Sequence, residues 1–136
     1  MARIILSLVV LSLVEITGAA QCVPNRFETN RFAGRIISEW EGGTEPIKGA
    51  TVTVRKATVS TILRSKITDL DGKFDLSRLH PGSYIVTVTA VHFEEFGVFL
   101  TIKSRKLKER RGSVEITLGL PSPRVDACIG TIRIQH

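Results

Sequence analysis

The segment from Thr68 to Phe93, TDLDGKFDLSRLHPGSYIVTVTAVHF, decides the fold of this chain because it combines two turn signals with an alternating strand. Asp71-Gly72 supplies a residue that tolerates the left-handed conformation of a tight hairpin. The carboxylate of Asp69 can accept backbone hydrogen bonds in an Asx turn. Pro81-Gly82 favours a type II turn, since Pro presets φ at the first central position and Gly tolerates a positive φ at the second.

The residues after the second turn alternate with a period of two. The apolar residues of this alternation share one face: Tyr84, Val86, Val88 and Ala90. The intervening threonines face the other way, which is typical of a half-buried strand. Short strands of this kind, separated by Gly and Pro turns, are expected at residues 31–39, 50–55, 60–68, 73–76, 84–91, 97–103 and 113–120, with a further edge strand at 129–134.

No stretch of ten or more residues after the N-terminal segment has the 3.6-residue apolar period of a helix. Residues 41–46 are expected to form a loop. Short strands at regular spacing with Gly and Pro turns are the pattern of an antiparallel sandwich. We therefore predict an all-β fold, an antiparallel β-sandwich of seven to eight strands. Ten residues are expected in its core: Val52, Val54, Phe74, Leu79, Tyr84, Val86, Val88, Val114, Ile116 and Leu118.

The N-terminus has the pattern of a secretory signal peptide. A short positive region ends at Arg3, an apolar run follows from Ile4 to Val14, and small residues occupy 17–20. The apolar run is shorter than the roughly 20 residues that a membrane span needs. We therefore predict removal of residues 1–20, a secreted or periplasmic protein and no membrane span. A retained signal anchor is the alternative.

Two cysteines, Cys22 and Cys128, lie near the two ends of the exported chain. An even pair in an exported protein suggests one disulfide. The alternative is a lipoprotein with an acylated Cys22, which requires an apolar residue three positions earlier and a small residue directly before the cysteine. Ala19 and Gln21 occupy those positions, and Gln21 fits poorly. Lipidation would also leave Cys128 without a partner.

The formal net charge is +6, and removal of residues 1–20 leaves it unchanged because that segment holds one cation and one anion. A basic surface attracts acidic glycans, lipid head groups or nucleic acid, and export argues against nucleic acid. A modest positive charge also serves solubility alone. Six cations gather between the last two strands of the alternating series: Lys103, Arg105, Lys106, Lys108, Arg110 and Arg111.

This basic run has two interpretations. It can bind an acidic glycan or phospholipid head groups, or it can be a solvated hairpin loop whose charge keeps strand edges from pairing. Trp40, which follows the first expected strand, is the best candidate for stacking on a sugar ring. Trp40 and the basic run together are therefore the candidate ligand contacts.

Catalytic and metal-binding motifs are missing from the sequence. The segment that starts at Asp69 imitates a calcium loop, but its twelfth position is His80 where a bidentate Glu is required. The three histidines, His80, His92 and His136, match no zinc-binding spacing. No Gly-x-Ser-x-Gly nucleophile motif occurs. We predict no metal, no cofactor and no enzymatic activity.

Five pieces of the sequence together resemble the carboxypeptidase regulatory-like domain, a transthyretin-like (prealbumin-like) β-sandwich. They are Gly34–Ile36, Pro46–Val54, Thr68–Phe74, Leu79–Tyr84 and Ala90–Phe93. The resemblance covers residues 31–120, which leaves 21–30 as an irregular leader and 121–136 as a C-terminal tail. The chain departs from the family at His92, where a Gly often precedes the aromatic residue.

The resemblance implies a module that binds, spaces or stabilises, and no catalytic residue set accompanies the domain. It also places the fold near carbohydrate-binding-like folds, which is only an analogy of fold. We therefore expect an exported non-catalytic module with a structural or protein-interaction role. The alternative is a carbohydrate-binding module for acidic glycans.

Overall fold

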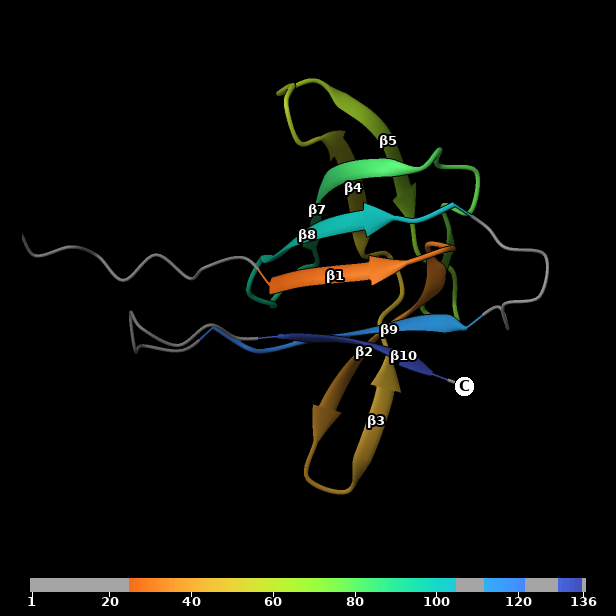
Figure 1. Ribbon diagram of the computed structural model, residues 1–136. Helices are drawn as coiled ribbons and strands as arrows, with labels where there is room; N and C mark the ends of the chain where they lie inside the picture. Colours follow the sequence, from red (N-terminus) through yellow and green to blue (C-terminus); the bar gives the residue numbers. More distant parts are fainter. Residues whose placement is uncertain (1–24, 105–111, 122–129, 136) are drawn as a thin grey trace, which may run out of the picture.

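Ten strands form two stacked sheets in the computed structural model, which describes residues 25–104, 112–121 and 130–135 (Figure 1). The strands are β1 (Asn25–Thr29), β2 (Ala33–Trp40), β3 (Gly43–Pro46), β4 (Thr51–Lys56), β5 (Ile62–Ile67), β6 (Lys73–Asp75), β7 (Gly82–Thr89), β8 (Phe96–Ile102), β9 (Ser113–Leu118) and β10 (Thr131–Gln135). The described residues include no helix long and apolar enough to cross a membrane.

The first sheet has the strand order β1-β8-β7-β4-β5, and the second has the order β10-β9-β2-β3, with β6 also paired to β2. This arrangement confirms the predicted all-β sandwich. The sheets are mixed rather than purely antiparallel, because β1 runs parallel to β8 and β2 runs parallel to β9. Both parallel pairs join segments far apart in the sequence, so no local turn signal in the sequence predicts them.

The core lies between the two sheets and follows the alternation of the strands. Nine of the ten residues expected in the core are buried: Val52, Val54, Phe74, Tyr84, Val86, Val88, Val114, Ile116 and Leu118. The tenth, Leu79, is half-buried and packs against the core from the loop before β7. The rings of Phe32 and Phe74 meet with their centroids 5.1 Å apart. Burial of these apolar side chains is the main stabilising contribution in such a domain.

The turn before β6 has the expected chemistry. The Asp69 carboxylate accepts hydrogen bonds from the backbone N–H groups of Asp71 and Lys73, each at 2.9 Å, and Gly72 has a φ of +70°. The calcium-like pattern is therefore a tight turn in which the carboxylate of Asp69 binds the backbone. The turn does not close the predicted hairpin, because β5 pairs with β4 in the first sheet and β6 pairs with β2 in the second. The second turn differs from expectation, since Gly82 has a φ of +153°, far from the roughly +80° of an ideal type II turn. Gly82 is instead the first residue of β7.

Two strands occupy segments that the sequence predicts to be irregular. β1 falls within the expected leader at residues 21–30, and β3 within the expected loop at 41–46. β1 is polar, but it gains its pairing from β8, and its Phe27 packs against the core. β3 extends the end of β2 as a hairpin that projects from the sandwich (Figure 1). In both cases tertiary pairing overrides local composition. The C-terminal tail contains β10, paired to β9.

Candidate anion-binding surface

An open hollow of about 440 Å³ lies between β5 and the chain from Asp75 to Leu79. Its walls come from the inward face of β5 and from the chain after β6. Three cations line it, Arg64 and Lys66 on β5 and Arg78 on the loop before β7, with one acid, Asp75. A hollow lined by several positive side chains concentrates positive potential and favours an anionic ligand.

The register of β5 explains why two cations point into this hollow. Arg64 pairs with Val54 and Lys66 with Val52, and both valines are fully buried. Residues directly opposite each other in a sheet share a face. Arg64 and Lys66 therefore extend from the core-facing side of the sheet, at the edge where the second sheet no longer covers it. Their side chains stay exposed there.

The hollow keeps a positive net charge. Hydrogen bonds from Ser77, followed by the charges of Arg31 and Lys66, hold the pKa of Asp75 below its ordinary value. Asp75 is therefore ionised at neutral pH and offsets only one of the three cations. Within the described residues, neither Arg64, Lys66 nor Arg78 forms an ion pair. All three remain available to an external anion.

Two further hollows adjoin the first and share Arg78 and Leu79 with it. One, of about 480 Å³, is lined by Lys56, Arg64 and His80 among others. The second, of about 520 Å³, extends to Lys103 at the end of β8. The hydroxyl of Tyr84 donates a 2.5 Å hydrogen bond to the backbone carbonyl of His80, which fixes this loop against β7. We call the surface formed by Lys56, Arg64, Lys66, Arg78 and Lys103 the basic surface.

Trp40 lies elsewhere, at the end of β2 in the projecting hairpin, with 60% of its surface exposed. Its ring covers the turn, since a Cβ added to Gly42 would meet the ring at 3.0 Å. Two carboxylates lie near it: Glu41 follows it in the turn, and Glu45 is on the same face of the hairpin, as its pairing with Ser38 shows. An acidic sugar stacked on Trp40 would meet like charge there. The ring suits a neutral ligand better than an acidic one.

The structure does not bring Trp40 together with the start of the basic run. Lys103 forms an ion pair of 2.7 Å with Glu28 on β1 and lies beside the hollow that contains Arg78. The end of β8 and the β2–β3 hairpin are well separated in Figure 1. The other cations of the run, Arg105, Lys106, Lys108, Arg110 and Arg111, lie outside the described residues, as do Cys22 and Cys128.

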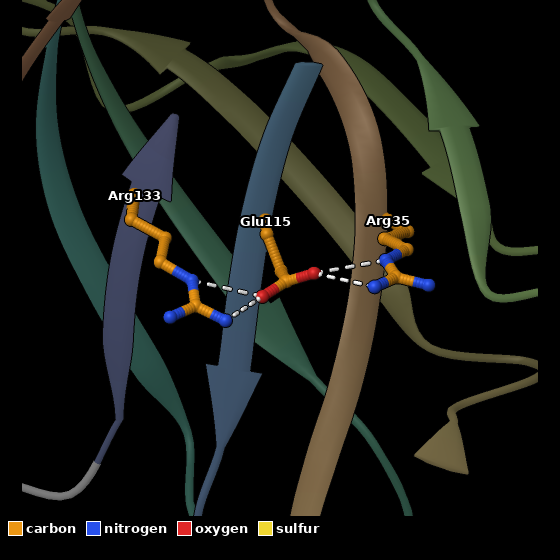
Figure 2. Close-up of polar contacts among 3 residues, drawn as sticks. All are labelled: Arg35, Glu115 and Arg133. Carbon is orange, nitrogen blue, oxygen red and sulfur yellow. Dashed lines mark hydrogen bonds and ion pairs between the residues drawn. The ribbon is translucent and has the colours of Figure 1, made fainter. Parts of the chain in front are cut away.

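A second charged cluster crosses the outer face of the other sheet. Glu115 on β9 lies between Arg35 on β2 and Arg133 on β10, which are its direct cross-strand neighbours (Figure 2). The Nε atoms of both arginines donate hydrogen bonds of 2.9 Å to its carboxylate, and only 1% of the Glu115 side chain is exposed. Burial acts to raise the pKa of Glu115, but the hydrogen bonds from Arg133 and Arg35 outweigh it, so the pKa lies below its ordinary value.

This Arg–Glu–Arg cluster joins the edge strand β10 to the rest of its sheet. Each carboxylate oxygen is already paired with a guanidinium, so the cluster has a structural role. Among the described residues, no group of three or more His, Cys, Asp or Glu side chains is placed to hold a metal ion.

Sequence reasoning missed both the hollow beside β5 and the Arg–Glu–Arg cluster. Each brings together residues from separate elements, and only the strand registers show that they meet. One signal was present for the hollow: Arg64 and Lys66 occupy alternate positions of a single short strand. Two cations on the core-facing side of a strand indicate that the second sheet does not cover that side.

The comparison with known families agrees with the fold. The model of the carboxypeptidase regulatory-like domain matches residues 31–120, which is more than half of the chain. No curated protein and no solved structure gives a match. The matched range runs from the residues just before β2 to just beyond the end of β9, so it includes the cations of the hollow. The chain belongs to the carboxypeptidase regulatory-like domain family.

Proposed function

We propose that this protein is an exported, non-catalytic interaction module that binds an acidic protein partner through its basic surface. The observation that carries the proposal is the hollow beside β5, where three cations without ion pairs in the described part of the chain face one carboxylate. The pattern of residues 1–20 supports export. The family is one of β-sandwich modules without a catalytic role, which supports a binding function.

The test measures binding of a fluorescently labelled octaglutamate peptide to the exported chain, residues 21–136. We expect saturable binding that weakens as salt rises from about 50 mM to about 500 mM, because salt screens exposed charges. The substitution Arg78→Glu should weaken binding at least about tenfold, since it removes one charge-assisted contact and adds a repulsive charge.

Arg26→Glu is the matched control for this experiment. Arg26 is an exposed cation on β1, at the opposite edge of the same sheet, and its reversal changes the net charge equally. It should leave the affinity within about twofold, a difference well below 1.4 kcal/mol. Equal losses in the two variants would show that only net charge matters and would reject a specific site.

A carbohydrate-binding role is the second candidate, and the exposure of Trp40 favours it. The glutamates of the hairpin direct this role toward neutral sugars rather than the acidic glycans expected from the sequence. A glycan array probed with the exported chain tests it. A sugar site at this ring should survive high salt and weaken in Trp40→Ala, because stacking is not screened. Binding that is unchanged in Trp40→Ala would exclude the ring.

A further inference from the structure

The β5 strand lies at the free edge of the first sheet. It pairs with β4 on one side, and no strand of the described residues pairs with it on the other. All six of its residues are exposed. The backbone N–H and C=O groups along such an edge can pair with another extended chain. The hollow described above opens directly beside this edge.

The two faces of β5 differ in chemistry. Arg64 and Lys66 lie on the core-facing side, as their partners Val54 and Val52 show. Ile67 pairs with Thr51 and lies on the opposite side, where 70% of its surface is exposed. Ile62, paired with Arg55 beyond the bulge, is 61% exposed. One side of the edge therefore offers positive charge and the other offers apolar surface.

We propose that the β5 edge accepts an extended acidic segment of a polypeptide as an additional strand of the first sheet. The inference rests on the proposed function and names the partner class for the same surface. Side chains of an added strand alternate between the two faces. Acidic residues at every second position then lie next to Arg64 and Lys66, and apolar residues between them lie next to the exposed isoleucines.

The geometry favours a polypeptide over a glycan as the occupant. Only a polypeptide backbone carries N–H and C=O groups at the spacing that a strand edge can pair. A second copy of β5 is disfavoured, because edge-to-edge pairing of two copies would bring their inward-pointing cations together. Arg64 and Lys66 therefore disfavour pairing between two copies of β5 and favour an acidic segment as the added strand.

The test compares two peptides of one composition on residues 21–136, one with Glu and Val alternating and one with four Glu followed by four Val. The alternating peptide should bind at least about tenfold more tightly, a factor equal to 1.4 kcal/mol. N-methylation of its Glu amides and of its Val amides should differ in effect, because only one set faces β5. N-methylation of the set of amides that faces β5 should abolish binding, and N-methylation of the other set should leave binding unchanged.

Protein variants locate the edge. Arg64→Glu should lose the preference for the alternating peptide, whereas Arg26→Glu, which reverses one exposed cation at the opposite edge of the same sheet, should retain it. Polygalacturonate supplies acidic groups without a peptide backbone. If it binds as tightly as the alternating peptide and neither N-methylation has an effect, strand addition is wrong and the electrostatic role of the hollow stands. If no anionic probe binds, both proposals fail.

Discussion

Glu115 shows how one residue holds the edge of the second sheet. Its carboxylate accepts hydrogen bonds from Arg35 and Arg133 while almost fully buried. Glu115→Gln should lower the free energy of unfolding by about 1–3 kcal/mol at neutral pH, since it removes charge from both hydrogen-bonded pairs. Glu28→Gln, in the exposed pair with Lys103, should cost less than about 1 kcal/mol. Urea denaturation of both variants measures the difference.

The same carboxylate gives a pH dependence. Its pKa in the folded state lies below the ordinary value of 4.5, so the unfolded chain binds its proton more readily. The stability from Glu115 is therefore complete above pH 4.5 and is lost as pH falls through the folded pKa. The stability gap between the natural chain and Glu115→Gln should narrow below about pH 4.5. A gap that stays constant with pH would contradict the ion-pair account.

His92 occupies a backbone conformation that suits glycine. Its φ of +70° lies in the left-handed region, which costs a residue with a Cβ roughly 1–2 kcal/mol. The turn that the family often forms with Gly is thus retained without it. His92→Gly should raise the free energy of unfolding by about 0.5–1 kcal/mol after the entropy gain of the unfolded chain is subtracted. His80→Gly, in a loop position without positive φ, should give no increase.

At the scale of elements, the close approach of β2 and β9 depends on Gly34. A Cβ at this position would overlap the backbone of Val114, its partner on the parallel strand β9. Gly34→Ala should destabilise the domain by more than about 3 kcal/mol, because the two backbones must separate. Gly97→Ala on β8 is the matched control, since an added Cβ there meets nothing within 4 Å. Thermal melts of the two proteins should differ clearly, and equal melting temperatures would refute the close approach.

The elements also show how far sequence reasoning reaches. The alternation of Val86 with Val88 and of Val114 with Ile116 is enough to place β7 and β9 and their buried faces. β1 has no such pattern, because its strand conformation depends on pairing with β8, more than 60 residues away. The hollow depends on both the edge position of β5 and the loop around Arg78. The alternation of Arg64 with Lys66 is a sequence signal for the edge position of β5, but nothing in composition or periodicity indicates that the loop around Arg78 lies beside it.

At the scale of the whole molecule, the strands that follow the two cysteines, β1 and β10, begin close enough to each other for a disulfide to be expected. Asn25 pairs with Val98 on β8, and Gly130 lies against the ring of Phe96 two residues earlier on the same strand. β1 and β10 thus begin at the same end of the sandwich (Figure 1). Cys22 precedes Asn25 by three residues and Cys128 precedes Gly130 by two. Such short segments can bring two cysteines within the roughly 6 Å between Cα atoms that a disulfide needs.

We predict that Cys22 and Cys128 form a disulfide in the exported protein. Peptide mapping without reductant should give the two cysteine peptides as one linked species, and reduction should lower the melting temperature, since the link constrains a long loop of the unfolded chain. An acyl group on Cys22 in the mass spectrum would identify a lipoprotein instead. Free thiols on both residues in exported material would contradict the link.

Charge is distributed unevenly over the molecule. The cations of the basic surface surround the chain between β6 and β7, whereas three glutamates gather on the β2–β3 hairpin. In Figure 1 the hairpin and the β5 edge project from opposite sides of the sandwich. An acidic partner is therefore attracted to one side and repelled by the other, which favours a single orientation of binding.

A two-dimensional NMR titration of the isotopically labelled chain with octaglutamate tests this account most directly, because it locates the contact. The account predicts shifts concentrated in the amides of residues 64–66 and 75–80, around the hollow beside β5, and little change in the β2–β3 hairpin. Shifts confined to the hairpin, or spread evenly over all exposed cations, would contradict it.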